Sequence, residues 1–158
     1  MKRIFLVLII SLISLNSQSQ TWEQIQEPTL RYLKEIAGMR GVLHMCKNDD
    51  VIVTLIGAES IELPGVSLKI IPWSEEAEVD CLSNLDVGIM PLPDEPWACG
   101  KCGFKLIQYM ASGLPVIASP IGVNKEIVDD GVNGFLADSN EQWIDALEKL
   151  YENVEMRA

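Results

Sequence analysis

The stretch from Gly100 to Ala137 constrains the fold of this chain more than any other part of it. Its sequence is GKCGFKLIQYMASGLPVIASPIGVNKEIVDDGVNGFLA. A glycine-led turn enters a helical pattern, a short apolar strand follows, and a Ser-Pro-Ile-Gly loop leads to an acid at the head of another helix. Strands that alternate with helices, with glycines at the helix starts, are typical of a parallel sheet whose edge binds a phosphate-bearing ligand.

The rest of the chain has the same alternation. Apolar patterns predict helices over 29–43, from Ser74 to about Asn84, over 106–112, from Lys125 and over 140–153, and strands over 51–56, 66–71, 86–90 and 115–118. The last helix is expected to direct Trp143, Ala146, Leu147 and Leu150 inward. The proline-rich segment after Met90 predicts an exposed loop at a strand's carboxyl end. We therefore expect an α/β fold with a parallel sheet covered by helices on both faces.

Charge and cysteine content narrow the classes of partner. The formal net charge is −11, from 23 acids and 12 bases, which argues against a nucleic-acid or anionic-membrane surface. An anionic ligand must therefore be held locally, by backbone amides and one or two bases. The cysteines at 46, 81, 99 and 102 lack the density of a disulfide-stapled module. Cys99 and Cys102 have the spacing of half a metal site, but without a second such pair we expect no metal.

Two interpretations fit the N-terminus. Lys2 and Arg3 precede the apolar run 4–15, and polar residues follow it over 16–20. This pattern is typical of a secretory signal peptide, whereas a run as rich in branched residues as IFLVLII is also typical of a buried first strand. The first interpretation divides the chain into a leader over 1–20, a linker over 21–28, one domain over 29–153 and a tail over 154–158.

Several motifs resemble one known family. Residues 104–111 (FKLIQYMA) and 113–119 (GLPVIAS) are similar to the C-terminal half of family-4 glycosyltransferases, which have the GT-B fold. The similarity continues through 131–137 (GVNGFLA) and back to 86–91 (DVGIMP). It implies a Rossmann-like domain, the C-terminal half of a GT-B fold, that binds a nucleotide-sugar donor.

The resemblance also implies what such a domain works with. Members of the family transfer the sugar with retention at the anomeric carbon, to an acceptor that here is an unknown glycan or lipid, and no metal or cofactor is expected. The acceptor is held by an N-terminal half without a counterpart in this sequence, so we expect the domain to be incomplete alone. The family implies a location in the cytoplasm or at the inner face of a membrane, whereas a genuine leader implies export.

The family's acidic motif has two glutamates separated by seven residues; the first contacts the donor sugar and the second contacts the ribose hydroxyls. These positions fall on Gly100 and Gln108. Gln108 can still hydrogen-bond ribose hydroxyls, without the charge-assisted strength of a carboxylate. Gly100 has no side chain to reach the sugar, so no residue is assigned as catalytic.

Some members carry a lysine three residues before the second acid, and Lys105 falls on it. The resemblance implies that Lys105 neutralises the donor diphosphate together with the amides of Gly103 and Phe104, because departure of a nucleoside diphosphate concentrates negative charge on phosphate oxygens. From spacing alone, Lys105 is equally well a solvated helix residue.

A second loop is expected at the same edge. Ser119 to Gly122 follows a strand and precedes a helix, and Gly122 is expected to supply a close approach or a positive φ. Glu126 is either a partner for sugar hydroxyls or an acid that complements the helix dipole. Asn133-Gly134 is interpreted as a turn.

The sequence is also compatible with a protein that has no catalytic function. With neither acid of the motif in place, the chain is either a donor-binding domain or a non-catalytic remnant, an exported interaction module that retains the fold.

Overall fold

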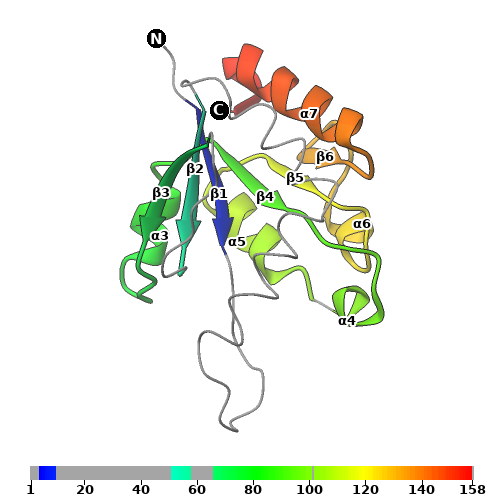
Figure 1. Ribbon diagram of the computed structural model, residues 1–158, viewed down its shortest axis with the longest axis horizontal. Coiled ribbons are helices and arrows are strands. Elements are labelled where there is room, and N and C mark those ends of the chain that lie inside the picture. The colour runs from blue at the N-terminus through cyan, green and yellow to red at the C-terminus, as the bar shows by residue number, and fades with distance from the viewer. Residues whose placement is uncertain (1–3, 10–50, 58–65, 101, 158) are drawn as a thin grey trace, which may run out of the picture.

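The computed structural model describes residues 4–9, 51–57, 66–100 and 102–157, and Figure 1 shows an open sheet with helices around it. The described strands are β1 (Ile4–Ile9), β2 (Val51–Ile56), β3 (Ser67–Ile71), β4 (Val87–Met90), β5 (Val116–Ala118) and β6 (Gly134–Leu136). The described helices are α3 (Glu78–Leu82), α4 (Pro96–Cys99), α5 (Phe104–Ala111), α6 (Asn124–Ile127), α7 (Asn140–Glu152) and the 3-10 helix η1 (Val154–Arg157).

The strand order is β3-β2-β1-β4-β5-β6, and neighbouring strands pair in parallel. This is the order of a Rossmann fold, in which the chain builds outward from β1 to one side and then crosses over to continue from β4 on the other. The predicted fold class, a Rossmann-like parallel sheet with helices on both faces, is confirmed.

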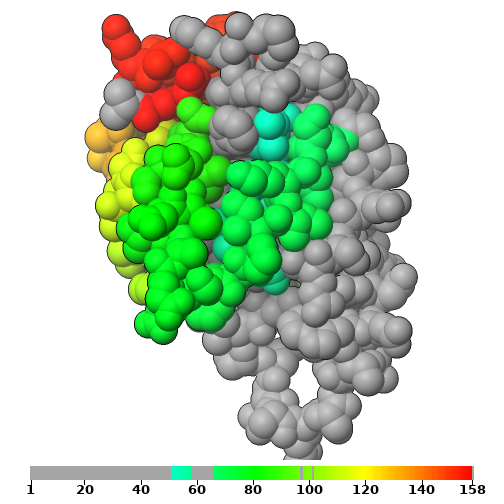
Figure 2. All heavy atoms as spheres, turned by 90° about the vertical axis from the view of Figure 1, so that its left-hand side faces the viewer, coloured from blue at the N-terminus to red at the C-terminus, as the bar shows by residue number. Residues whose placement is uncertain are grey.

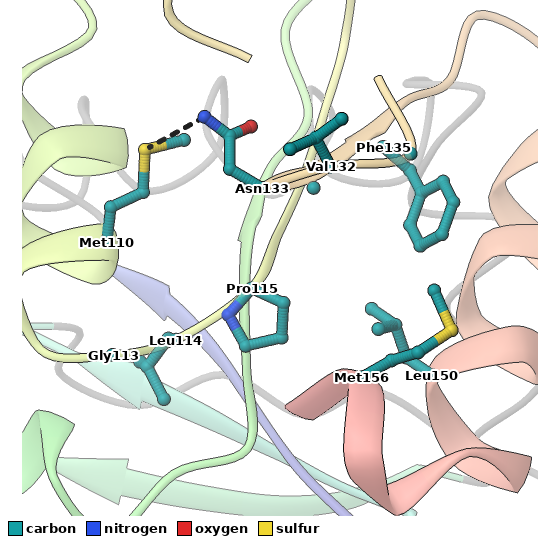
Figure 3. Close-up of a pocket in the computed structure, with 11 residues that line it drawn as sticks. Met110, Gly113, Leu114, Pro115, Val132, Asn133, Phe135, Leu150 and Met156 are labelled. Atoms are coloured by element: carbon teal, nitrogen blue, oxygen red, sulfur yellow. Dashed lines mark hydrogen bonds between the residues drawn. The ribbon is translucent and has the colours of Figure 1, made fainter. Parts of the chain in front are cut away.

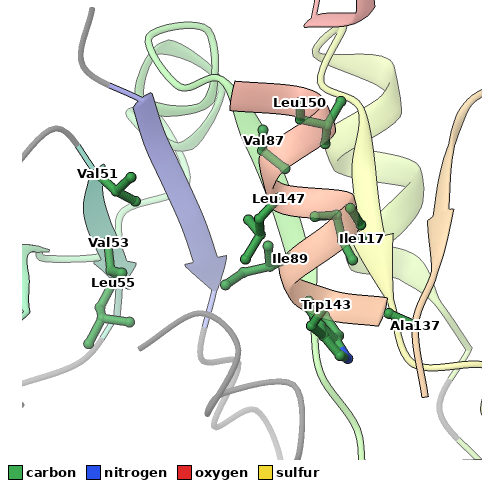
Figure 4. Packing of buried hydrophobic residues seen from close by; sticks show 11 residues of the cluster. Val51, Val53, Leu55, Val87, Ile89, Ile117, Ala137, Trp143, Leu147 and Leu150 are labelled. Carbon is green, nitrogen blue, oxygen red and sulfur yellow. The ribbon is translucent and has the colours of Figure 1, made fainter. Parts of the chain in front are cut away.

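Each face of the sheet has its own core, because alternate residues of a strand point to opposite faces. Val53, Ile89 and Ile117 belong to the core beneath α7, where Trp143 and Leu147 are buried with them (Figure 4). The positions predicted to point inward from this helix, Trp143, Ala146, Leu147 and Leu150, are all buried, as expected.

The opposite face packs against α5. Leu106 and Tyr109 are fully buried there, together with Leu82 of α3. A Cβ built on Gly88 would lie 2.4 Å from the Tyr109 ring. A glycine in the middle of β4 therefore lets the ring rest directly on the sheet, and this brings α5 close to the strand that precedes it.

The N-terminal run forms the strand of the second interpretation. Residues 4–9 make β1, which lies between β2 and β4, with Leu6 in register with both Val53 and Val87. The sheet thus includes residues that precede the expected domain start at 29. The interpretation of this run as an export signal stays a prediction, and the predicted helix over 29–43 lies outside the described residues. Within the described ranges, no helix is both long and apolar enough to cross a membrane.

Three local predictions need correction. The helix after β3 starts at Glu78, because residues 75–77 form a turn in which the Ser74 hydroxyl accepts the Ala77 N–H at 3.2 Å. The proline-rich loop contains the short helix α4, which Pro96 starts at a position where its missing N–H costs nothing. The interpretation of Asn133-Gly134 as a turn is wrong at Gly134, because Gly134 begins β6 and pairs with Val116.

The expected tail over 154–158 is instead ordered as η1 over Val154–Arg157. The Arg157 guanidinium donates to the carbonyl oxygens of Leu150 and Tyr151 at the end of α7. It also lies 3.7 Å from the carboxylate of Asp86, immediately before β4. One side chain thus satisfies the last carbonyls of a helix and ties them to the sheet.

Candidate functional site

The carboxyl edge of the sheet gathers the starts of three helices. In a parallel sheet every helix that follows a strand begins near that strand's carboxyl end. α3 follows β3, α5 comes after β4, and α6 follows β5, at the edge toward which the arrowheads of β1, β2 and β3 point in Figure 1. The helix starts and the connecting loops therefore define the candidate site.

The start of α5 is shaped by Gly103. This residue is the N-cap with a φ of 64°, and a Cβ on it would lie 2.4 Å from Cδ1 of Ile127 in α6. The left-handed backbone favours glycine here, and an added Cβ would displace the end of the Ile127 side chain. The amides of Phe104 and Lys105 have no acceptor within the helix, whereas the Leu106 N–H donates to the Gly103 carbonyl at 2.9 Å. Phe104 is 56% exposed. This helix start is accessible to an anion.

Lys105 and Gln108 meet on a carboxylate that the sequence analysis did not single out. The Lys105 ammonium lies 3.0 Å from Oε1 of Glu78, and the Gln108 amide donates to Oε2 of the same residue at 3.1 Å. The side chains of the ion pair are only 15% and 12% exposed. The interpretation of Lys105 as a freely solvated helix residue is therefore wrong.

The environment of Glu78 keeps its carboxylate charged. Burial acts to raise the pKa of Glu78, but the hydrogen bond and charge of Lys105, with hydrogen bonds from Gln108 and Trp73, outweigh it and hold the pKa below its ordinary value. The Glu78 carboxylate is therefore ionised at neutral pH.

The Gln108 amide has one satisfied end. Its nitrogen donates to Glu78, whereas Oε1 is buried and has no hydrogen-bond partner among the residues that the structure describes. Exchanging the two ends would place an oxygen against a carboxylate, which accepts only, so the orientation follows from the contact. An unmatched acceptor remains beside the ion pair.

The loop after β5 is held by buried polar contacts. The Ser119 hydroxyl accepts the Leu92 N–H at 2.9 Å, and the side-chain amide of Asn124 donates to the Ser119 carbonyl at 3.0 Å. Gly122 has a φ of 54°, and a Cβ there would lie 2.6 Å from the Cys99 carbonyl oxygen. The expected close approach and positive φ are both present at Gly122, and the approaching group is the end of α4.

The remaining predicted residues lie at the same edge. Glu126 is exposed in the first turn of α6, and its neighbour Ile127 packs against Gly103. Cys99 and Cys102 are exposed free thiols. Among the described residues no cluster of three or more histidine, cysteine or acidic side chains could hold a metal.

The hollow of about 240 Å³ in Figure 3 lies at the opposite edge of the sheet. Pro115, which precedes β5, and Gly134, which begins β6, line it, together with Leu150 and Met156 from the end of the chain. Figure 3 also shows Asn133 reaching toward the sulfur of Met110. The strand ends that define the candidate site are on the other side of the sheet.

Comparison with protein families finds a match over residues 33–153, which is more than half of the chain. The matching family is described as Glycosyl transferases group 1. The chain belongs to this family. The motifs that suggested a glycosyltransferase in the sequence lie within the matched range.

Individual relatives agree with this assignment. The D-inositol 3-phosphate glycosyltransferase of Paenarthrobacter aurescens is 31% identical over 96 residues, which are 60% of this chain and 20% of that protein. Anabaena Alr3699/HepE, solved with UDP and glucose, has a TM-score of 0.64 at 15% identity over 99% of this chain and 40% of its own. S. aureus TarM, solved with UDP among its ligands, has a TM-score of 0.60 at 17% identity over 99% of this chain and 30% of its own. The chain thus spans less than half the length of each, and the solved structures share its fold.

Two polar residues of this edge were missed in the sequence. Glu78 was hidden because acids after Ser74 are expected simply to complement a helix dipole, and because the helix starts later than Ser74 suggests. Asn124 is 1% exposed. The sequence around it, directly after Val123, has no hydrophobic periodicity that would predict a buried polar residue. Glu78 and Lys105 are 27 residues apart in the sequence, so no local pattern indicates that they are in contact.

Proposed function

We propose that this chain is the donor-binding domain of a retaining family-4 glycosyltransferase. It binds a nucleotide-sugar at the carboxyl edge of its sheet, and a separate acceptor-binding half completes the enzyme. The observation that carries the proposal is the start of α5, where Lys105 is in the first turn and the N-cap Gly103 lies against Val123, which follows β5. A cation and helix amides are the groups that stabilise a leaving diphosphate.

Each predicted donor-binding residue has a defined part in this proposal. The amides of Gly103 and Phe104 and the ammonium of Lys105 face the diphosphate. Gln108 offers its unmatched oxygen to a ribose hydroxyl, because a hydroxyl can donate to it. Ser119, Gly122 and Glu126 shape the sugar side of the edge. No metal is required, since the lysine and the helix start supply the positive charge.

Relatives support the ligand class. Alr3699/HepE was solved with UDP and glucose, and TarM was solved with UDP. This chain has the fold of both and belongs to a glycosyltransferase family. The proposed partners are therefore a nucleotide-sugar and a glycan or lipid acceptor, in the cytoplasm or at the inner face of a membrane.

Calorimetric titration of the whole chain with uridine, guanosine and adenosine diphosphate-sugars tests the proposal. We expect saturable binding of at least one of them, and competition by the matching nucleoside diphosphate but not by the free sugar. Absence of binding to all three classes would rule the proposed function out.

A second candidate function has one observation in its favour. Gly100 and Gln108 occupy the positions of the family's two glutamates, so the fold could persist in a non-catalytic interaction module. This candidate predicts no nucleotide-sugar binding and, if the N-terminal run directs export, a mature N-terminus near Thr21 outside the cytoplasm. Mass spectrometry of the protein from cell fractions distinguishes the two.

A further inference from the structure

Glu78 is the point where the helices α3 and α5 meet in polar contact. It is the first residue of α3, and its two oxygens accept from Lys105 at 3.0 Å and from Gln108 at 3.1 Å, one helical turn apart on α5. Two donors of α5 therefore converge on a single side chain of α3.

The contact with Glu78 restricts the conformation of the Lys105 side chain but engages only one of its hydrogen-bond donors. A lysine ammonium has three donors, and Glu78 accepts one of them. Fixing a free lysine costs side-chain rotamer entropy. With the ammonium already held on a carboxylate that is 12% exposed, most of that ordering takes place on folding. One contact leaves two donors of the ammonium for a ligand.

The same carboxylate sets the direction of Gln108. Because its oxygens only accept, they select the nitrogen end of the amide, and Oε1 of Gln108 has no partner within the described part of the chain. A single acid thus determines where one donor and one acceptor of α5 point.

We propose that Glu78 is the positioning residue of the donor site, holding Lys105 for the diphosphate and Gln108 for the ribose of a nucleotide. This inference rests on the proposed function. Glu78 acts through the two residues and is not itself catalytic.

A double-mutant cycle on the whole chain tests the inference, with UDP and uridine as probes. The variants are Glu78→Gln, which keeps the size of the side chain, Lys105→Ala and the double variant. The matched control is Asp80→Asn, which removes an acid from the exposed side of the same helix. Thermal unfolding of each variant confirms that it is folded.

We expect Glu78→Gln to weaken UDP binding about tenfold, which is the loss of roughly one charge-assisted interaction, and to change uridine binding less than UDP binding. In the Lys105→Ala background the same change should weaken UDP binding only about twofold, and Asp80→Asn should leave UDP binding unchanged. A full tenfold loss in the Lys105→Ala background, or equal losses for both probes, would overturn the inference.

A measurement without nucleotide keeps the inference separate from the proposed function. Acetylation of Lys105 by acetic anhydride, followed by peptide mass spectrometry, should be slow in the unmodified chain, faster in Glu78→Gln and unchanged in Asp80→Asn. Equal rates in all three would show that Glu78 does not hold Lys105, whatever binds. Failure of the unmodified chain to bind UDP, uridine or any nucleotide-sugar would instead overturn the proposed function.

Discussion

The two edges of the sheet differ in what they offer a ligand. The carboxyl edge has a left-handed glycine at a helix start, an ion pair and an unmatched amide oxygen. The opposite edge has the hollow of Figure 3, whose lining includes Leu114, Phe135 and Met156 and no ionisable side chain. The hollow of Figure 3 is thus lined mainly by apolar side chains and backbone.

This difference shows that the candidate site is located by the direction of the strands and not by the position of the hollow. Helix starts, with their free amides, gather only where parallel strands end. On the side of β3 shown in Figure 2, green atoms cover much of the described surface, with cyan atoms beside them and the red C-terminal residues near the upper end.

Replacing one glycine near each edge tests whether the backbone at the carboxyl edge is more closely packed than the backbone at the opposite edge. Gly122→Ala should lower the free energy of unfolding by about 2–4 kcal/mol, because a positive φ and an overpacked contact both destabilise. Gly113→Ala, near the opposite edge, should cost only about 1 kcal/mol, because its φ of 77° is positive but no atom lies within 4 Å of the added Cβ. Denaturant unfolding compares the two, and equal losses would contradict the contrast.

Removing one lysine from each edge tests where the anion binds. Lys105→Ala should weaken UDP binding about 10- to 100-fold, since it removes the charge nearest the start of α5. Lys149→Ala, whose ammonium lies 5.5 Å from the Phe135 ring centroid, should change it less than about twofold. Calorimetry measures both, and the reverse ranking would move the site to the other edge.

Lowering the pH should weaken the carboxyl edge. The pKa of Glu78 in the folded chain lies below its ordinary value of 4.5, so the unfolded chain binds more protons between the two values. The stability that Glu78 contributes is complete above 4.5 and is lost as the pH falls through the folded pKa. The unfolding free energies of the unmodified chain and Glu78→Gln should therefore converge on acidification; a constant difference would show that the charge of Glu78 is not responsible.

Filling the hollow should have the smallest effect. Val132 lines it and is 78% exposed, so Val132→Trp places a large side chain there without disturbing the core. We expect UDP affinity to change less than about twofold, because the substitution is at the edge opposite Lys105 and the start of α5. A larger loss in a titration would show that the two edges are coupled.

The sequence predicted those elements whose signal is local. The strand at 51–56 has the predicted bounds, and the closing helix buries the four residues expected from its periodicity. β6 was missed because its three residues carry no alternation, and its place is set by pairing with β5. The seven predicted donor-binding residues lie at one edge, and their roles there stay proposals.

What the sequence determined by itself was the alternation of strands and helices, the glycines at Gly103 and Gly122, and the family, since each depends on short-range patterns. Only the tertiary structure decided that residues 4–9 form a central strand and that Glu78 joins Lys105 and Gln108. The physical reason is the same in both cases. Strand pairing and side-chain contacts between helices join residues far apart in the chain, and no local periodicity encodes which of them meet.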